Sequence, residues 1–423
     1  MNRSMSNASR LAVRTLALAG AVLVPAFASP AAAQVPAELE PAWDALVAAH
    51  RAALDSTGIV GATLALVKDG EIAAVDYHGF ADRATRRPVD ERTIYHWASI
   101  TKTYTGVAIM QLRDRGRLDL DDPVVEYVPE LRQAHSPYGS IDEVTLRHLM
   151  SHSSGFRNPT WPWDEGEAWQ PFEPTEWSQL VAMMPYTRLH FEPGSRYGYS
   201  NPGVIFLGRT LEAVTGDVYE AYIDKNLLDP LGMASAYFDG TPWRLLPHRS
   251  NSYRVIGGEP VVRGLEFNTG ITVSNGGLNA TVPDMAKWVG FVAGAVVGDR
   301  AAGRRPAAYV TVLARTSLEE MWTPGVPVDD QDSAVGAVRM GLSFFLYDAG
   351  GRRVVGHTGS QHSFRSFILV DPGSDFGLIG AWNTADGDAT APDTDALRSA
   401  VMARALAELF PAAPTRPDRS TAP

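Results

Sequence analysis

Ser99 and Lys102 open an apolar stretch that ends near Gly116, and this stretch constrains the fold more than any other part of the sequence. Residues three apart share one face of a helix, so the serine hydroxyl and the lysine amine are expected side by side. Apolar side chains follow at helical spacing: Ile100, Tyr104, Val107, Ala108 and Leu112. The pattern predicts a buried helix, and burial lowers a lysine pKa enough for the amine to assist a serine. Taken alone, S-x-x-K more often lies on a solvated helix face.

Two further stretches carry side chains of catalytic types. Tyr199-Ser200-Asn201 stands between the turn-rich residues 192–195 and Pro202-Gly203, which predicts a constrained loop outside any regular element. His357-Thr358-Gly359-Ser360 closes a strand-like run at 353–356 and precedes another at 366–370. A glycine beside a strand permits close approach of a ligand to the backbone. Each stretch by itself also fits a plain structural role, a loop tyrosine or a histidine at a strand end.

In the order S-x-x-K, Y-x-N and H-T-G, the three stretches resemble the active-site elements of the penicillin-recognising serine hydrolases. The resemblance is to the branch that holds class C beta-lactamases, D-alanyl-D-alanine carboxypeptidases, D-aminopeptidases and lactamase-like esterases. Further similar segments follow the family's order: Leu149–Gly155, Pro230–Met233, Gly276–Leu278 with Asp284, and Trp382-Asn383. The resemblance implies an α+β fold, in which an antiparallel sheet flanked by helices carries an inserted, mostly helical lobe.

The third triplet departs from the pattern of class C beta-lactamases, where a lysine usually stands at the position of His357. Histidine there resembles the peptidase and esterase members. We therefore expect an acyl-enzyme hydrolase of esters or of D-residue amides and peptides. Two alternatives stay open, a beta-lactamase and a catalytically silent protein of the same fold that binds peptidoglycan or a partner; the presence of all three triplets weighs against the silent protein.

The chemistry also follows from the residue types. Acyl transfer needs a nucleophile, a base and donors aimed at the developing oxyanion. Ser99 is the candidate nucleophile, and Lys102 can take its proton or hold a neighbouring phenolate, for which Tyr199 is the candidate. A free phenol has a pKa of about 10, so it acts as a base near neutrality only when cations stabilise its anion. The sequence leaves open which of the two is the base, because the pair can titrate as one unit.

The resemblance implies the remaining roles. Tyr199 would also protonate the leaving group and later activate the deacylating water, and Asn201 would orient Lys102 and the substrate amide. The resemblance also implies four residues on the substrate and oxyanion side of the active site: His357, Thr358, Gly359 and Ser360. The first two would line the carboxylate or leaving-group side, and the backbone amides of Ser99 and Ser360 would form the oxyanion hole.

Residues 1–33 are typical of a signal peptide. Three arginines precede the apolar run Leu16–Val24, and Ala31-Ala32-Ala33 supplies a small-residue cleavage site. The run is short for a bilayer span and prolines follow it, so we expect cleavage near Ala33, a secreted or periplasmic protein and no stable membrane anchor. The chain has no cysteine, which excludes disulfides and a lipid-attached N-terminus of the lipoprotein type.

Charge and motifs narrow the partners. Loss of three arginines and no acidic residue takes the net charge from -11 to -14, which argues against nucleic acid and anionic membranes. Walker loops, dinucleotide fingerprints and cysteine clusters are missing from the sequence, so no cofactor is expected. His148 and His152 lack a matching carboxylate motif; no metal is expected, and His152 is assigned to a structural turn around Ser153–Gly155. A small-molecule or peptide substrate is the expected partner, and the oligomeric state stays open.

The mature chain of 423 − 33 = 390 residues shows no linker. We expect an α/β lobe at about 34–98 and 241–410, a helical lobe at about 99–240 and a disordered tail at 411–423. The expected elements are a helix at 39–54, a hairpin of 63–67 and 71–77, strands at 364–370 and 376–382, and a last helix at 396–409. An aromatic stretch from Trp161 to Trp177 fits either a pocket wall or cover for a core edge.

Overall fold

The computed structural model describes residues 35–156, 174–264, 268–294, 307–328, 335 and 339–414. Residues from Ala33 onward belong to one compact unit. Its helices in the described residues are α1 (Glu40–Thr57), α2 (Thr101–Asp114), α3 (Leu146–Met150), α4 (Trp177–Met183), α5 (Asn201–Thr215), α6 (Tyr219–Ile223), α7 (Val273–Gly276), α8 (Val282–Ala293), α9 (Ala307–Val312), α10 (Arg315–Met321), α11 (Thr394–Arg404) and α12 (Phe410–Ala412). The strands are β1 (Gly61–Lys68), β2 (Glu71–Asp82), β3 (Arg87–Pro88), β4 (Ile94–His96), β5 (Tyr237–Phe238), β6 (Ser252–Ile256), β7 (Glu259–Gly264), β8 (Leu278–Thr281), β9 (Arg339–Met340), β10 (Phe345–Ala349), β11 (Arg352–Gln361), β12 (Phe364–Asp371), β13 (Phe376–Trp382) and β14 (Thr384–Gly387).

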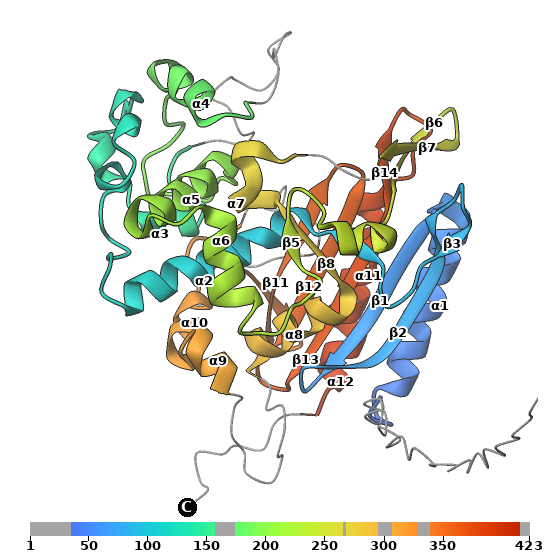
Figure 1. The fold of residues 1–423 in the computed structure, drawn as a ribbon. Helices are drawn as coiled ribbons and strands as arrows, with labels where there is room; N and C mark the ends of the chain where they lie inside the picture. Colours follow the sequence, from blue (N-terminus) through green and yellow to red (C-terminus); the bar gives the residue numbers. More distant parts are fainter. Residues whose placement is uncertain are drawn as a thin grey trace, which may run out of the picture. The chain divides into compact units, whose positions relative to one another are not determined.

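An eight-stranded antiparallel sheet in the order β3-β2-β1-β13-β12-β11-β10-β9 organises the unit. Strand β1 pairs with β2 on one side and with β13 on the other, with Leu64 opposite Asp76 and Gly380. Figure 1 shows the early strands in blue beside the late strands in red. The expected hairpin, the two late strands and their shared sheet are therefore confirmed, as is the α+β fold class. Two three-stranded sheets, β14-β6-β7 and β4-β8-β5, complete the strands.

Both faces of the central sheet are buried at β1, β12 and β13, which explains why these strands are mostly apolar. Successive side chains of a strand point to opposite faces. In β1, Leu64 and Leu66 pack with α1 and α11, whereas Ala65 and Val67 belong to the core that contains α8. Residues on β12 and β13 divide in the same way between the two cores. The sheet is the rigid middle layer, and β11 in it carries the third triplet.

Helix α2 is the centre of the helical part of the unit. Every residue from Thr101 to Leu112 is buried, as expected of a helix that is surrounded on all sides. A short 3-10 turn, η1 (Ala98–Ile100), leads into it, and Gly116 follows its end with φ +65°. Helices α5 and α7 pack against α2, and α3 packs against α5 (Figure 1). The predicted core helix is therefore present, with Ser99 in the 3-10 turn that leads into it.

Three local expectations need correction. The triplet from His357 lies inside β11 and does not follow a strand end, because the ladder to β12 continues to Gln361 opposite Phe364. Asn201 is the first residue of α5, since the Ser200 side chain caps that helix by accepting from Gly203 N. The chain beyond Phe410 also stays packed for longer, because α12 reaches Ala412 and the next alanine is buried.

No helix among the described residues is long and apolar enough to span a membrane.

Candidate active site

Lys102 and Ser99 meet at the start of α2. Nζ of Lys102 donates to Oγ of Ser99 at 2.9 Å and to the main-chain oxygen of Asn275 at 2.8 Å. The lysine side chain is completely buried, whereas Ser99 is half-buried. Burial without a carboxylate partner lowers the pKa of Lys102 well below its ordinary value. The pair therefore combines a reachable hydroxyl with an amine that can hold or release a proton.

The turn that presents Ser99 is strained and firmly anchored. Ala98 has φ +49° although it has a side chain, and such left-handed residues cost about 1–3 kcal/mol. Thr101 Oγ1 donates to the main-chain oxygen of Ala98 at 2.7 Å and accepts from the Leu278 amide at 3.1 Å. The strained turn is thus tied to β8, which fixes the position of the serine.

Tyr199 lies beside this pair. Nζ of Lys102 is 5.0 Å from the centre of the Tyr199 ring, which packs on the His152 ring at 4.4 Å. The following helix is also tied to the site, because Asn275 Nδ2 donates to the main-chain oxygen of Asn201 at 3.3 Å. The first two sequence triplets therefore come together around the lysine.

His357 approaches the same group from β11. Its ring centre is 6.3 Å from that of Tyr199 and 5.0 Å from that of Phe345. Burial, aided by the positive charge of Lys102, lowers the pKa of His357 to about 3. The imidazole is therefore uncharged near neutrality. Its Nδ1 pairs with the Thr358 main-chain oxygen at 2.6 Å, and its Nε2 has no hydrogen-bond partner in the described part of the chain.

Gly359 brings β11 directly onto the turn that holds Ser99. A Cβ atom at this position would lie 2.3 Å from the main-chain oxygen of Trp97 and 2.3 Å from Ser366 Oγ. Only glycine permits this approach of strand to turn. Thr358 and Ser360 are more accessible than His357 and Gly359, as the alternation of a strand requires, so His357 and Thr358 do not share a face of β11.

A side chain of α11 fixes the position of Ser360. Arg398 Nη1 donates to Ser360 Oγ at 2.8 Å and to the Gly359 main-chain oxygen at 2.9 Å. Asp395 accepts from Arg398 at 2.7 Å and from Arg365 at 3.1 Å. Arg365 is therefore buried in an ion pair with Asp395.

Three residues near the site were missed or undervalued by the sequence reasoning. Asn275 accepts from Lys102 and stands directly before the Gly276-Gly277-Leu278 segment, which was the available signal. Arg398 could not be recognised as a site residue from the sequence, because helical spacing shows only which face of α11 it lies on. His152 was noticed but assigned to a turn.

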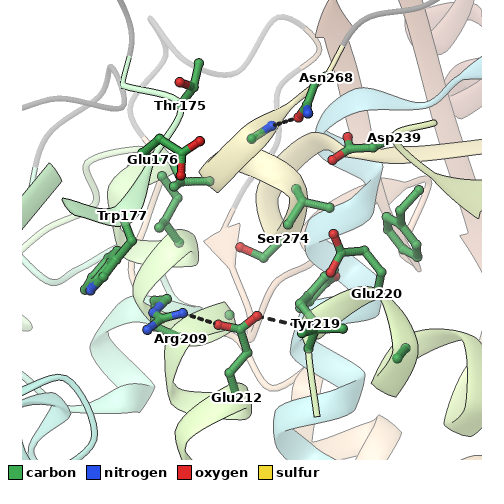
Figure 2. A pocket seen from close by; sticks show the side chains of 18 residues that line it. Thr175, Glu176, Trp177, Arg209, Glu212, Tyr219, Glu220, Asp239, Asn268 and Ser274 are labelled. Carbon is green, nitrogen blue, oxygen red and sulfur yellow. Dashed lines mark hydrogen bonds and ion pairs between the residues drawn. The ribbon is translucent and has the colours of Figure 1, made fainter. Parts of the chain in front are cut away.

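A separate cavity of about 970 Å³ opens beside α5, α6 and α7 (Figure 2). Trp177, Arg209 and Glu212 line one wall, and Glu212 pairs with Arg209 and accepts from the Tyr219 amide at 3.1 Å. Ser274, the neighbour of Asn275, lines it as well. Trp177 is thus a cavity residue, while the expected aromatic residues from Trp161 to Phe172 lie outside the described residues.

Within the described ranges, no group of three or more histidine and carboxylate side chains is arranged to hold a metal ion.

The chain belongs to the beta-lactamase family, whose model matches residues 43–402. This confirms the resemblance inferred from the three triplets. Protein flp of Staphylococcus aureus is 26% identical over 321 residues, which are 76% of this chain and 59% of that protein. Esterase EstB of Burkholderia gladioli is 32% identical over 231 residues, which are 52% of this chain and 56% of EstB. The chain thus spans under two thirds of the length of these relatives.

Solved structures show the same fold. A class C beta-lactamase superimposes with a TM-score of 0.66 at 20% identity, covering 87% of this chain and 96% of that one. A D-stereospecific amidohydrolase from Streptomyces sp. gives a TM-score of 0.62 at 23% identity, covering 83% and 97%. The antiparallel sheet with flanking helices is therefore the beta-lactamase and transpeptidase architecture.

Proposed function

We propose that this protein is an exported serine hydrolase that cleaves esters, or amides next to a D-residue, through an acyl-enzyme on Ser99. The observation that carries the proposal is the completely buried Lys102, whose Nζ lies 2.9 Å from Ser99 Oγ. A reachable serine beside a lysine that is easily deprotonated is an activated nucleophile.

In this mechanism the proton of Ser99 passes to the Lys102 and Tyr199 pair as Oγ attacks the substrate carbonyl. The Asn275 carbonyl and the Ser99 hydroxyl already orient the amine, so little rearrangement is needed. The phenol of Tyr199 would return the proton to the leaving group and later take one from the deacylating water. Whether the lysine or the phenol holds the proton at each moment is a property of the coupled pair.

The oxyanion side would use the backbone amides of Ser99 and Ser360. Preorganised donors of this kind are worth several kcal/mol to acyl transfer. Two contacts support this role. Gly359 packs on the turn before Ser99, and Arg398 donates a hydrogen bond to Ser360 Oγ. Asn201 would orient Lys102 and the substrate amide from the start of α5.

The substrate class is inferred from His357. Its lowered pKa leaves the position uncharged near neutrality, so it offers no permanent cation to the carboxylate of a beta-lactam. EstB is named an esterase, and the Streptomyces structure is named a D-stereospecific amidohydrolase. Both names agree with ester or D-amide substrates for this chain.

The test is a panel of p-nitrophenyl esters, D-amino-acid amides, D-Ala-D-Ala peptides and nitrocefin, offered to the purified mature protein. Turnover together with fluorophosphonate labelling that is lost in Ser99→Ala is the expected result. A folded wild-type protein without turnover or labelling would make it the silent binder. Labelling that survives in Ser99→Ala would mean that another serine reacts.

The export proposal has its own test. N-terminal sequencing of the protein recovered from the periplasm or medium of an expression host should begin at Gln34, directly after Ala33. Recovery of uncleaved protein from the membrane fraction would contradict it.

A further inference from the structure

His152 has a backbone conformation that is unfavourable for a histidine. It follows α3 and Ser151 with φ +52°, and its residue surface is 1% exposed. Glycine and asparagine adopt this left-handed conformation at lower cost than histidine. A purely structural turn would therefore favour glycine or asparagine at this position. The contacts of the imidazole indicate why a histidine is present.

Three consecutive residues of the Tyr199 loop contact His152. The Gly198 amide donates to the His152 main-chain oxygen at 2.8 Å. The Ser200 amide donates to Nδ1 of the imidazole at 3.2 Å. Between them, the Tyr199 ring lies on the imidazole with ring centres 4.4 Å apart and planes at 34°. One residue therefore holds the loop before, at and after the tyrosine.

The imidazole is uncharged in this position. Because Nδ1 accepts the Ser200 amide, the ring proton lies on Nε2. Burial is the main cause that lowers the pKa of His152 well below its ordinary value, and the neighbouring Lys102 amine adds to the lowering. An uncharged ring supports Tyr199 without adding a second cation beside Lys102.

We propose that His152 is a positioning residue that holds the Tyr199 phenol beside Lys102 through the loop 198–200. The inference rests on the proposed function, since it acts through Tyr199. It replaces the assignment of His152 to a structural turn. The turn accounts for the backbone of His152, but it accounts for neither the bond from Ser200 nor the ring contact with Tyr199.

Two substitutions separate side chain from backbone. His152→Gly suits the left-handed conformation and removes the acceptor, whereas His152→Asn suits the same conformation and keeps an oxygen acceptor near Nδ1. We expect His152→Gly to lower kcat for a p-nitrophenyl ester at least about tenfold with little change in KM, since small displacements of catalytic groups are costly. His152→Asn should recover a clear part of that loss. Equal kcat in the two variants would overturn the proposal.

A double-mutant cycle tests whether His152 acts through the tyrosine. In a Tyr199→Phe background, His152→Gly should cause little further loss of kcat. A full and independent tenfold loss there would show that His152 acts elsewhere and would overturn the proposal.

A crystal structure of His152→Gly provides a readout that does not depend on activity. Displacement of loop 198–200 with α3 and α5 unmoved is expected, and an unmoved loop would overturn the proposal. This measurement separates the inference from the proposed function, which fails instead if the wild-type protein shows neither turnover nor Ser99 labelling.

Discussion

Nζ of Lys102 lies 2.9 Å from Oγ of Ser99 inside a site that excludes water from the lysine. Burial without a carboxylate partner makes the charged form of an amine unfavourable, so the amine holds its proton weakly. In the proposed mechanism, this contact would let an ordinary hydroxyl act as the nucleophile without a histidine base. In that mechanism the proton balance of the site also depends on Tyr199, whose ring centre lies 5.0 Å from the amine nitrogen.

The lysine and the tyrosine are predicted to act as one unit. Lys102→Ala and Tyr199→Phe should each lower the acylation rate at least about a hundredfold, a typical scale for positioned acid-base groups. The double variant should lose far less than the product of the two effects, because residues that share one proton are non-additive. Stopped-flow measurement of acylation by a p-nitrophenyl ester checks this.

Lys225→Ala is the matched control for the lysine substitution, because the Lys225 side chain is 68% exposed and lies in an ion pair with Asp217. It should acylate at the wild-type rate. Fully multiplicative losses in the double variant would rule out a shared proton.

The close approach of β11 to the nucleophile turn predicts a sharp effect at Gly359. In Gly359→Ala the new Cβ meets the main-chain oxygen of Trp97 at 2.3 Å, and a main-chain atom cannot rotate away. The strand must shift from the turn, so Ser99 labelling should slow by about a hundredfold. Gly240→Ala, whose Cβ would meet nothing within 4 Å, is the control. Normal labelling in Gly359→Ala would show that the strand position is not critical.

Much of the fold was predictable because local pattern and tertiary packing agree. The apolar periodicity after Ser99 predicts α2, and the burial of Leu64 in one core and of Ala65 in the other is what two covered sheet faces require. The triplets could be placed only approximately. Where a strand ends depends on its partner, and β11 continues through His357 because β12 pairs with it.

The supporting contacts of the site were beyond sequence reasoning for a physical reason. Asn275 accepts from Lys102 through a main-chain oxygen, which every residue type possesses, so only its place before Gly276-Gly277-Leu278 could have marked it. Arg398 reaches β11 from a helix 38 residues later, and only the packing of α11 on the sheet reveals it. The spacing of His148 and His152 was noticed in the sequence. It does not reveal that His152 has a left-handed backbone and that its ring contacts Tyr199.

Buried histidines predict how stability depends on pH. Burial is the main cause that lowers the pKa of His50 to about 4 and those of His96 and His357 to about 3, from 6.5. The unfolded chain therefore binds more protons below pH 6.5. Stability is complete above about pH 6.5 and is lost as the pH falls toward 4 and then 3, by up to about 1.4 kcal/mol per pH unit for each histidine.

Chemical denaturation at pH 7.5, 6.0, 5.0 and 4.5 measures this slope. His96→Gln should flatten it by up to about 1.4 kcal/mol per pH unit, whatever the variant costs in absolute stability. A stability that is constant from pH 7.5 to 4.5 would contradict the prediction.

The charge at position 357 is predicted to set the substrate class. His357 is uncharged near neutrality, so the wild-type protein should hydrolyse short-chain esters or D-residue amides with kcat/KM values orders of magnitude above that for nitrocefin. His357→Lys places a cation beside the site and should shift the ratio toward the anionic lactam, although the second charge near Lys102 will lower absolute rates. His357→Gln is the neutral control and should keep the wild-type ratio. A wild-type enzyme that destroys nitrocefin efficiently and ignores every ester and D-amide would be a beta-lactamase.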